Sequence, residues 1–223
     1  MRKVIYVVVI LITSVMSGIT YGDTVVNMIG DIDGFQGGDP ADVPPRSQTL
    51  LDAFASFGAT PFDMDIQSEN TPGKGFTHMF SIPAGQIITS ATLTVGMYWE
   101  RSNAHISDAL MLDDTVRGLA NGSILWSPSM PRMRIQDVLG YIPGFGTTEV
   151  IMDLSSVPVR PFSEATPVNQ NFISELLDGE FDVIVGEDSN ADYSILSIET
   201  IPEPTTLSLL SFSALTLLRR KRT

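Results

Sequence analysis

Apolar and polar residues alternate along several short stretches of the chain, as they do in β-strands that bury one face. In residues 91–97, Ala-Thr-Leu-Thr-Val-Gly-Met, the odd positions are apolar and the even ones small or polar. Further runs rich in β-branched and aromatic residues are bounded by Gly, Pro, Asn or Asp. The predicted strands are residues 24–29, 75–82, 87–99, 106–112, 148–154, 181–185 and 193–198. Short strands with Gly- and Pro-rich links predict an antiparallel β-sandwich with two sheets.

Helical periodicity is confined to short segments. Residues 47–57 carry apolar side chains at positions 50, 51, 54 and 57 and follow two prolines, which predicts a short helix. Residues 172–177 precede Gly179 and predict a single turn. Residues 116–147 are rich in Gly, Pro and Met, and we expect a long loop there. The Asp113-Asp114 pair is expected to form a turn.

The predicted body also resembles the jelly-roll domains of exported bacterial proteins. The resemblance rests on Phe-Thr-His-Met-Phe-Ser-Ile-Pro at 76–83, on the strand at 88–95 and on the segment 176–193. Such domains include modules similar to carbohydrate-binding ones. The resemblance implies an all-β, jelly-roll-like body at residues 23–200 with one or two short helices.

The first 22 residues have the pattern of a signal peptide. Arg2 and Lys3 precede an apolar run at 4–12, and small or polar residues follow as far as Gly22. We expect cleavage after Gly22, so that Asp23 begins the mature chain and the Sec translocon and signal peptidase are partners. The alternative is an uncleaved membrane anchor, for which the apolar run is short.

The last residues combine three features in a fixed order. Pro202, Glu203 and Pro204 are followed by an apolar run at 207–218 and then by Arg219, Arg220, Lys221 and Arg222. This tail, residues 201–223, resembles the PEP-CTERM sorting signal of Gram-negative bacteria that make exopolysaccharide. The same tail is sometimes labelled an ice-binding protein C-terminal domain, a label that does not imply ice binding.

The resemblance implies a destination and an enzyme partner. In the family an exosortase recognises the Pro-Glu-Pro motif at the membrane, so Pro202, Glu203 and Pro204 would carry recognition here. The apolar run would enter the bilayer while the cationic end stays inside. The run has 12 residues, which departs from the roughly 20 that span a hydrocarbon core. A terminal helix that is buried or amphipathic is the alternative.

Charge excludes one class of partner. The formal net charge is −13, and residues 23–200 hold seven basic residues against 25 acidic ones. Nucleic acid is therefore a poor partner, because phosphate binding needs clustered Lys and Arg. Solubility alone also explains the acidity. The chain has no cysteine, which excludes disulfides, thiolate metal sites and a Cys nucleophile.

Two acidic clusters predict a calcium site. Asp31, Asp33 and Asp39 lie in one Gly-rich loop, and Glu187, Asp188 and Asp192 precede the last strand. Carboxylate oxygens suit Ca²⁺, although the spacing is not that of an EF-hand. In a jelly roll the first and last strands often lie close together, so the clusters could share one ion. The alternative is solvated turn carboxylates that bond their own backbone.

Catalysis has little support in the sequence. The only histidines are His78 and His105, and neither a nucleophile elbow nor a zinc-binding histidine pair occurs. His78 is expected to face solvent or a hydrogen-bonding partner across the sheet. The aromatic residues Trp99, Trp126 and Tyr141 are candidates for stacking on sugar rings, or simply for packing.

These features together predict an exported protein of the cell envelope or extracellular matrix, with a transient inner-membrane stage. Its body is expected to be noncatalytic and to have a structural or adhesive role near exopolysaccharide. A carbohydrate-binding module, with Ca²⁺ as a stabilising ion, is the alternative. A polysaccharide-active enzyme is a third possibility.

Overall fold

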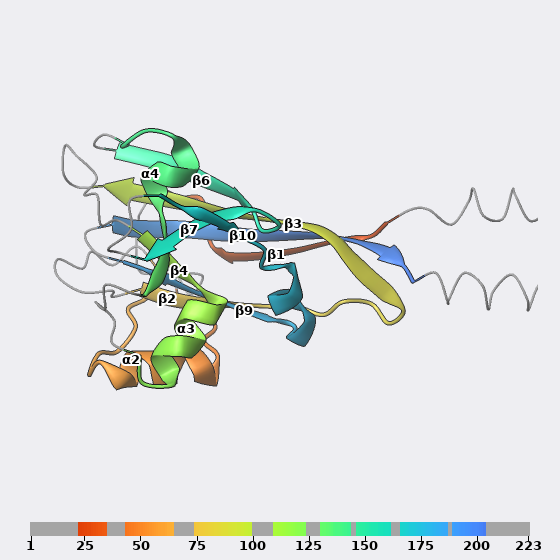
Figure 1. Ribbon diagram of the computed structural model, residues 1–223, viewed down its shortest axis with the longest axis horizontal. Helices are drawn as coiled ribbons and strands as arrows, with labels where there is room; N and C mark the ends of the chain where they lie inside the picture. Colours follow the sequence, from red (N-terminus) through yellow and green to blue (C-terminus); the bar gives the residue numbers. More distant parts are fainter. Residues whose placement is uncertain are drawn as a thin grey trace, which may run out of the picture. The chain divides into compact units, whose positions relative to one another are not determined.

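The computed structural model describes residues 22–34, 43–64, 74–99, 109–123, 130–143, 146–161, 166–186 and 189–203 (Figure 1). The chain divides into two compact units. The terminal unit comprises Met1–Val25, Ile82–Thr89 and Ile198–Thr223, and the main unit comprises Val26–Ser81 and Ser90–Ser197.

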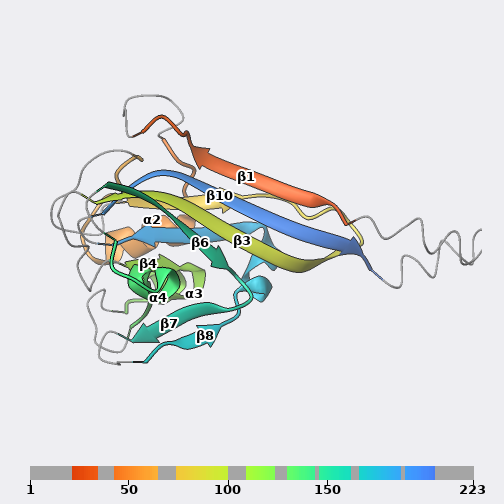
Figure 2. The same cartoon turned by 90° about the horizontal axis from the view of Figure 1, so that it is seen from above.

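The strands form two sheets. The four-stranded sheet has the order β1-β10-β3-β6, with β1 at Thr24–Gly30, β3 at Gln86–Trp99, β6 at Gly146–Asp153 and β10 at Ser189–Pro202. The six-stranded sheet has the order β2-β9-β4-β5-β7-β8. Its strands are β2 Lys74–Met79, β4 Ala109–Leu112, β5 Pro131–Arg134, β7 Val157–Pro161, β8 Val168–Gln170 and β9 Glu180–Val185. Figure 2 shows β1, β10 and β3 side by side.

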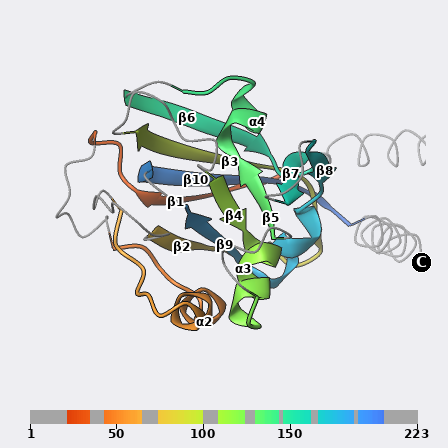
Figure 3. The ribbon, with the colours of Figure 1, turned by 60° about the vertical axis from the view of Figure 1, so that its left-hand side comes forward.

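Within the main unit the two sheets form the predicted sandwich (Figure 3). In β3 the alternating residues Leu93, Val95 and Met97 are fully buried. They pair with apolar residues of the antiparallel neighbour β6, for example Leu93 with Met152 and Val95 with Val150. The other sheet pairs Phe76 of β2 with Val183 of β9, both fully buried. The period-two alternation is therefore what brings the two apolar faces into one core.

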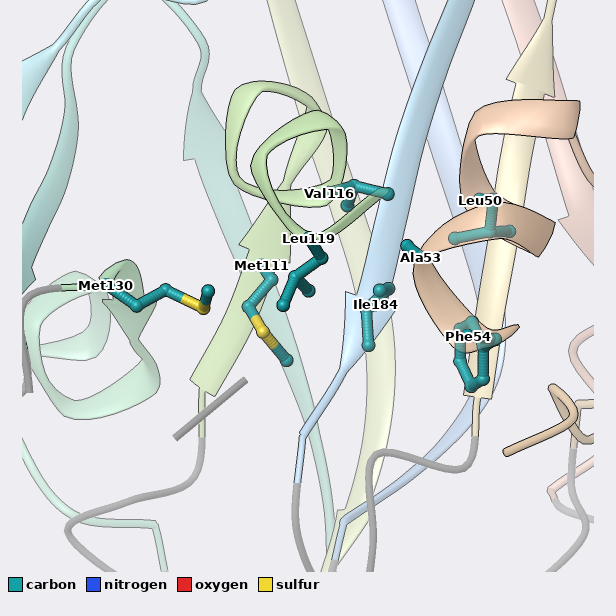
Figure 4. Packing of buried hydrophobic residues seen from close by; sticks show 8 residues of the cluster. All are labelled: Leu50, Ala53, Phe54, Met111, Val116, Leu119, Met130 and Ile184. Atoms are coloured by element: carbon teal, nitrogen blue, oxygen red, sulfur yellow. The ribbon is translucent and has the colours of Figure 1, made fainter. Parts of the chain in front are cut away.

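Two helices cover the outer face of the six-stranded sheet. They are α2, Gln48–Ser56, and α3, Asp113–Ala120. Ser47 caps α2 by accepting a hydrogen bond from the Leu50 N–H at 3.0 Å. The helices and the sheet share a second apolar cluster (Figure 4), formed by Leu50, Ala53, Phe54, Met111, Val116, Leu119, Met130 and Ile184. The six-stranded sheet is thus buried on both faces at β4 and β9.

The predicted all-β sandwich with short helices is confirmed, and both predicted helical segments are present. The second is the 3₁₀ helix η2 at Ile173–Asp178. The predicted turn at Asp113 and Asp114 is wrong, because these residues open α3. Acidic side chains stabilise a helix in its first turn. Gly118 and the short length of α3 obscure the helical signal in the sequence.

The expected loop at 116–147 is also wrong. It contains most of α3, all of β5, the helix α4 at Ile135–Leu139 and the start of β6. The strands β7 and β8 were not predicted. Prolines within β5 and β7 hide their strand character, since proline cannot donate to the ladder and is disfavoured in strands.

Candidate metal centre

The end of β1 brings the first acidic loop against the last strand. Gly30 ends β1 with a φ of 72°, a conformation that favours glycine. A Cβ at this position would lie 2.2 Å from the carbonyl oxygen of Asp192 in β10. The end of β1 can therefore lie this close to β10 only with glycine here, and residues that follow it lie beside Asp192.

Three of the predicted carboxylates meet at this close approach. One oxygen from each of Asp31, Asp33 and Asp192 lies within 4.8 Å of the others. Asp192 is buried, and the other two are half-buried. Like charges this close repel one another in a partly dry environment, and a cation that binds them offsets the repulsion. Ca²⁺ takes such oxygen ligands in a flexible geometry.

A buried ammonium group lies on the same side of β10. Lys74 of β2 is 1% exposed, and its Nζ donates to Oδ1 of Asn190 in β10. Asn190 and Ser194 both contact side chains of β2. Because side chains alternate along a strand, Asp192 lies on the same face of β10 as these two residues. The protein thus supplies one positive charge of its own to this end of the sandwich. No pattern in the sequence marks Lys74 as buried.

The other three predicted ligands cannot be compared with this cluster. Asp39, Glu187 and Asp188 lie outside the described residues. Of the predicted ligands that the structure describes, Asp31, Asp33 and Asp192, all three come together and join the first loop to the last strand.

A second carboxylate cluster is paired with an arginine. Oxygens of Asp113, Asp114 and Glu175 also lie within 4.8 Å of one another. The guanidinium of Arg117 lies 2.8 Å from Asp113, 3.8 Å from Asp114 and 3.3 Å from Glu175. These carboxylates raise the pKa of Arg117, Asp113 first among them. The arginine occupies the place that a metal would take, so this cluster is a salt-bridge network.

Buried carboxylates join the helices to the six-stranded sheet. Asp182 of β9 accepts hydrogen bonds from Ser47 Oγ at 2.8 Å and from Thr77 Oγ1 at 2.5 Å. Burial raises the pKa of Asp182, and these hydrogen bonds oppose the rise. Asp113 accepts a hydrogen bond from the Asp182 N–H at 3.3 Å. Burial raises the pKa of Asp113 to about 7, although this hydrogen bond and Arg117 oppose the rise. This network fixes the first turns of α2 and α3.

His78 connects the two sheets. It is fully buried in β2, and its ring lies 2.6 Å from Asn27 Oδ1 of β1 and 2.8 Å from Ser194 Oγ of β10. The Asn27 amide nitrogen donates to the Met79 carbonyl, so its Oδ1 accepts from Nδ1 of the imidazole. Nε2 then accepts from the Ser194 hydroxyl. Burial lowers the pKa of His78 to about 3 and keeps the ring neutral.

Two of the three predicted aromatic residues belong to the described part of the chain. Trp99 ends β3 opposite Gly146, Trp126 lies outside the described residues, and Tyr141 is 56% exposed after α4. Sequence reasoning missed Tyr193 of β10, whose ring lies over Gly96 and whose hydroxyl donates to Glu149 Oε1. Burial and the Glu149 carboxylate raise the Tyr193 pKa to about 12.

The described part of the predicted sorting motif continues the last strand. Pro202 ends β10, and the Glu203 N–H donates to the carbonyl oxygen of Gly85 at 2.8 Å. Pro204, Arg219, Arg220, Lys221, Arg222, the apolar tail and the predicted signal peptide before Gly22 lie outside the described residues. Within the part of the chain that is described, no helix has the length and apolar character to cross a bilayer.

Comparison with known proteins gives no assignment. No protein-family model matches the chain, and no curated protein matches it.

Proposed function

We propose that the chain is an exported protein of the cell envelope or extracellular matrix, delivered by exosortase, with a noncatalytic sandwich that has a structural or adhesive role. One observation carries the proposal. The Pro-Glu-Pro motif begins at Pro202, the last residue of β10, and an apolar run and a cationic end follow it in the sequence. A sorting signal must become accessible at the edge of the folded body, and this one begins where the last strand ends.

The strand order supports the finer proposal that the sandwich is a jelly roll. The first, third, sixth and tenth strands form one sheet, and the second, fourth, fifth and ninth form adjacent members of the other. An eight-stranded jelly roll alternates its strands between two sheets in this way. In this proposal β7 and β8 are an extension of the second sheet.

The state of three buried titratable residues in the described part of the chain supports a noncatalytic body. A general acid or base must reach the substrate, yet His78 is fully buried with both ring nitrogens engaged. Asp113 and Asp182 are also buried, in a network that joins helices to strands. Their shifted pKa values follow from structural burial.

The proposal is tested by expressing the full chain in a host with its exosortase gene intact and in the same host with that gene deleted. Mass spectrometry of the envelope fraction should find the shortened chain only in the intact host. Deletion of the gene should leave the uncut chain in the inner membrane. An identical product in both hosts would refute sorting by exosortase.

A calcium-stabilised carbohydrate-binding module is the second candidate. The meeting of Asp31, Asp33 and Asp192 favours it, because the sequence predicted a shared ion between these two segments. Retention of the purified full chain on its host's immobilised exopolysaccharide, with Ca²⁺ or with a chelator, separates the module from a purely structural body.

Calorimetric melting of the full chain tests the ion directly. An ion bound only by the folded state, present at 100 times its dissociation constant, stabilises by about 2.7 kcal/mol. Asp192→Asn should abolish the calcium-dependent rise in melting temperature. Asp114→Asn is the matched control and should keep it, because Asp114 belongs to the cluster that Arg117 neutralises. Equal melting temperatures of the wild type in Ca²⁺ and in chelator would exclude a structural ion.

A further inference from the structure

The first part of the Pro-Glu-Pro motif is held within the terminal unit. Pro202 is the last residue of β10, and Glu203 follows it and contacts the turn that precedes β3. The Glu203 N–H donates to the carbonyl oxygen of Gly85 at 2.8 Å. Gly85 adopts a φ of 75°, a backbone conformation that favours glycine.

This hydrogen bond uses a donor that the motif cannot replace. Pro202 and Pro204 have no N–H, so the Glu203 N–H is the one backbone donor of the triplet. Enzymes that bind an extended segment commonly pair with its backbone groups as an added strand. In the folded chain Gly85 already holds the donor that such an enzyme would use.

Further contacts fix the end of β10 in the same place. The Thr200 N–H donates to the Asp23 carbonyl oxygen at 2.9 Å, and Thr200 Oγ1 contacts both that oxygen and Gln86 Oε1. The Gln86 amide donates to the Asp23 carboxylate at 2.6 Å. We refer to Asp23, Gly85, Gln86 and Thr200 as the clip. Asp23 is also the expected first residue of the mature chain.

We propose that the clip holds the sorting motif closed, and that the sorting enzyme binds the motif only after Glu203 separates from Gly85. The inference rests on the proposed function, since it assigns a regulatory contact to the same motif. A chain whose terminal unit has folded is then processed more slowly than one in which the end of β10 is open. The enzyme competes with the carbonyl of Gly85 for a single N–H group.

The test compares Gly85→Ala with Gly58→Ala in the full chain, in a host that contains the exosortase. Both glycines have a positive φ, 75° and 73°, so alanine strains both turns alike. Gly58 lies in the main unit with nothing within 4 Å of an added Cβ. Pulse-chase labelling should show processing of Gly85→Ala roughly fivefold faster than wild type, the population change for about 1 kcal/mol. Gly58→Ala should match wild type. An unchanged or slower rate for Gly85→Ala would overturn the proposal.

A second pair of variants distinguishes loss of the clip from a folding defect. Thr200→Val keeps the shape of the side chain but removes its contacts to Asp23 and Gln86, and it should also speed processing. Thr147→Val, at an exposed position of β6, is its control and should process at the wild-type rate.

Hydrogen exchange separates this inference from the proposed function. In the purified full chain the Glu203 amide should be protected, and Thr200→Val should make it exchange faster. An unprotected Glu203 amide in the wild type would overturn the clip whatever the processing rates are. A protected amide in a chain that no exosortase processes would refute the sorting function and the gating role while leaving the contact itself intact.

Discussion

Two buried residues respond to pH in opposite directions. The pKa of His78 falls from an ordinary 6.5 to about 3, so the unfolded chain binds more protons than the folded chain between these values. Its contribution to stability is complete above pH 6.5 and is lost as the pH falls toward 3. The pKa of Asp113 rises from 3.8 to about 7, so its contribution is complete below pH 3.8 and is lost as the pH rises toward 7.

His78→Gln should therefore reduce the loss of stability in acid. Glutamine offers a donor and an acceptor to Asn27 and Ser194 but does not titrate. The slope is at most about 1.4 kcal/mol for each pH unit, so from pH 6.5 to 4.5 the wild type should lose about 2 to 3 kcal/mol more than the variant. Urea unfolding at both values measures the difference. The same pH dependence in both proteins would contradict a buried neutral imidazole.

Asp113→Asn is the matched control for that experiment. It removes a buried titrating group whose effect has the opposite sign, and the groups that face it are Arg117, Asp182 and Asp178. The control should therefore show a steeper loss of stability than the wild type as the pH falls from 7 to 4.5. An equal or shallower loss would mean that the carboxyl is ionised throughout this range.

At the scale of elements, alternation predicted the long strands and could not predict the short ones. The run at 91–97 identified β3 because four buried residues follow at period two. In contrast, β8 has three residues and an exposed Val168, which leaves too few positions for any period to emerge. The helix α3 depends on packing against α2 and β9, since its own sequence contains a glycine and only eight residues.

Two glycine substitutions test the helical layer with opposite expected signs. A Cβ on Gly75 of β2 would lie 2.6 Å from the Phe54 ring of α2, so Gly75→Ala should destabilise by about 1 to 3 kcal/mol. A Cβ on Gly118 of α3 would meet nothing nearer than Ser123 Oγ at 3.7 Å. Gly118→Ala should stabilise by about 0.5 to 1 kcal/mol, because glycine is a poor helix former. Denaturant unfolding measures the change in stability of each variant. Equal changes in the two variants would contradict the packing of α2 on β2.

At the scale of the whole molecule, the sequence predicted the sandwich and the three carboxylates that meet after β1, but not what surrounds them. Asp31, Asp33 and Asp192 were predictable because the first and last strands of such a sandwich are neighbours. Lys74 was not, because burial of an ammonium depends on a long-range partner, Asn190, that no local pattern reveals. The contact of Glu203 with Gly85 likewise joins segments far apart in the chain.

The central claim is that the C-terminal residues direct the protein to the outside of the cell. Its most direct test is cell fractionation of the full chain and of a chain that lacks residues 202–223, both detected with an antibody against the sandwich. The full chain should be found in the matrix or at the cell surface, and the truncated chain should remain in the periplasm. The same distribution for both chains, or a cytoplasmic location for the full one, would contradict the account.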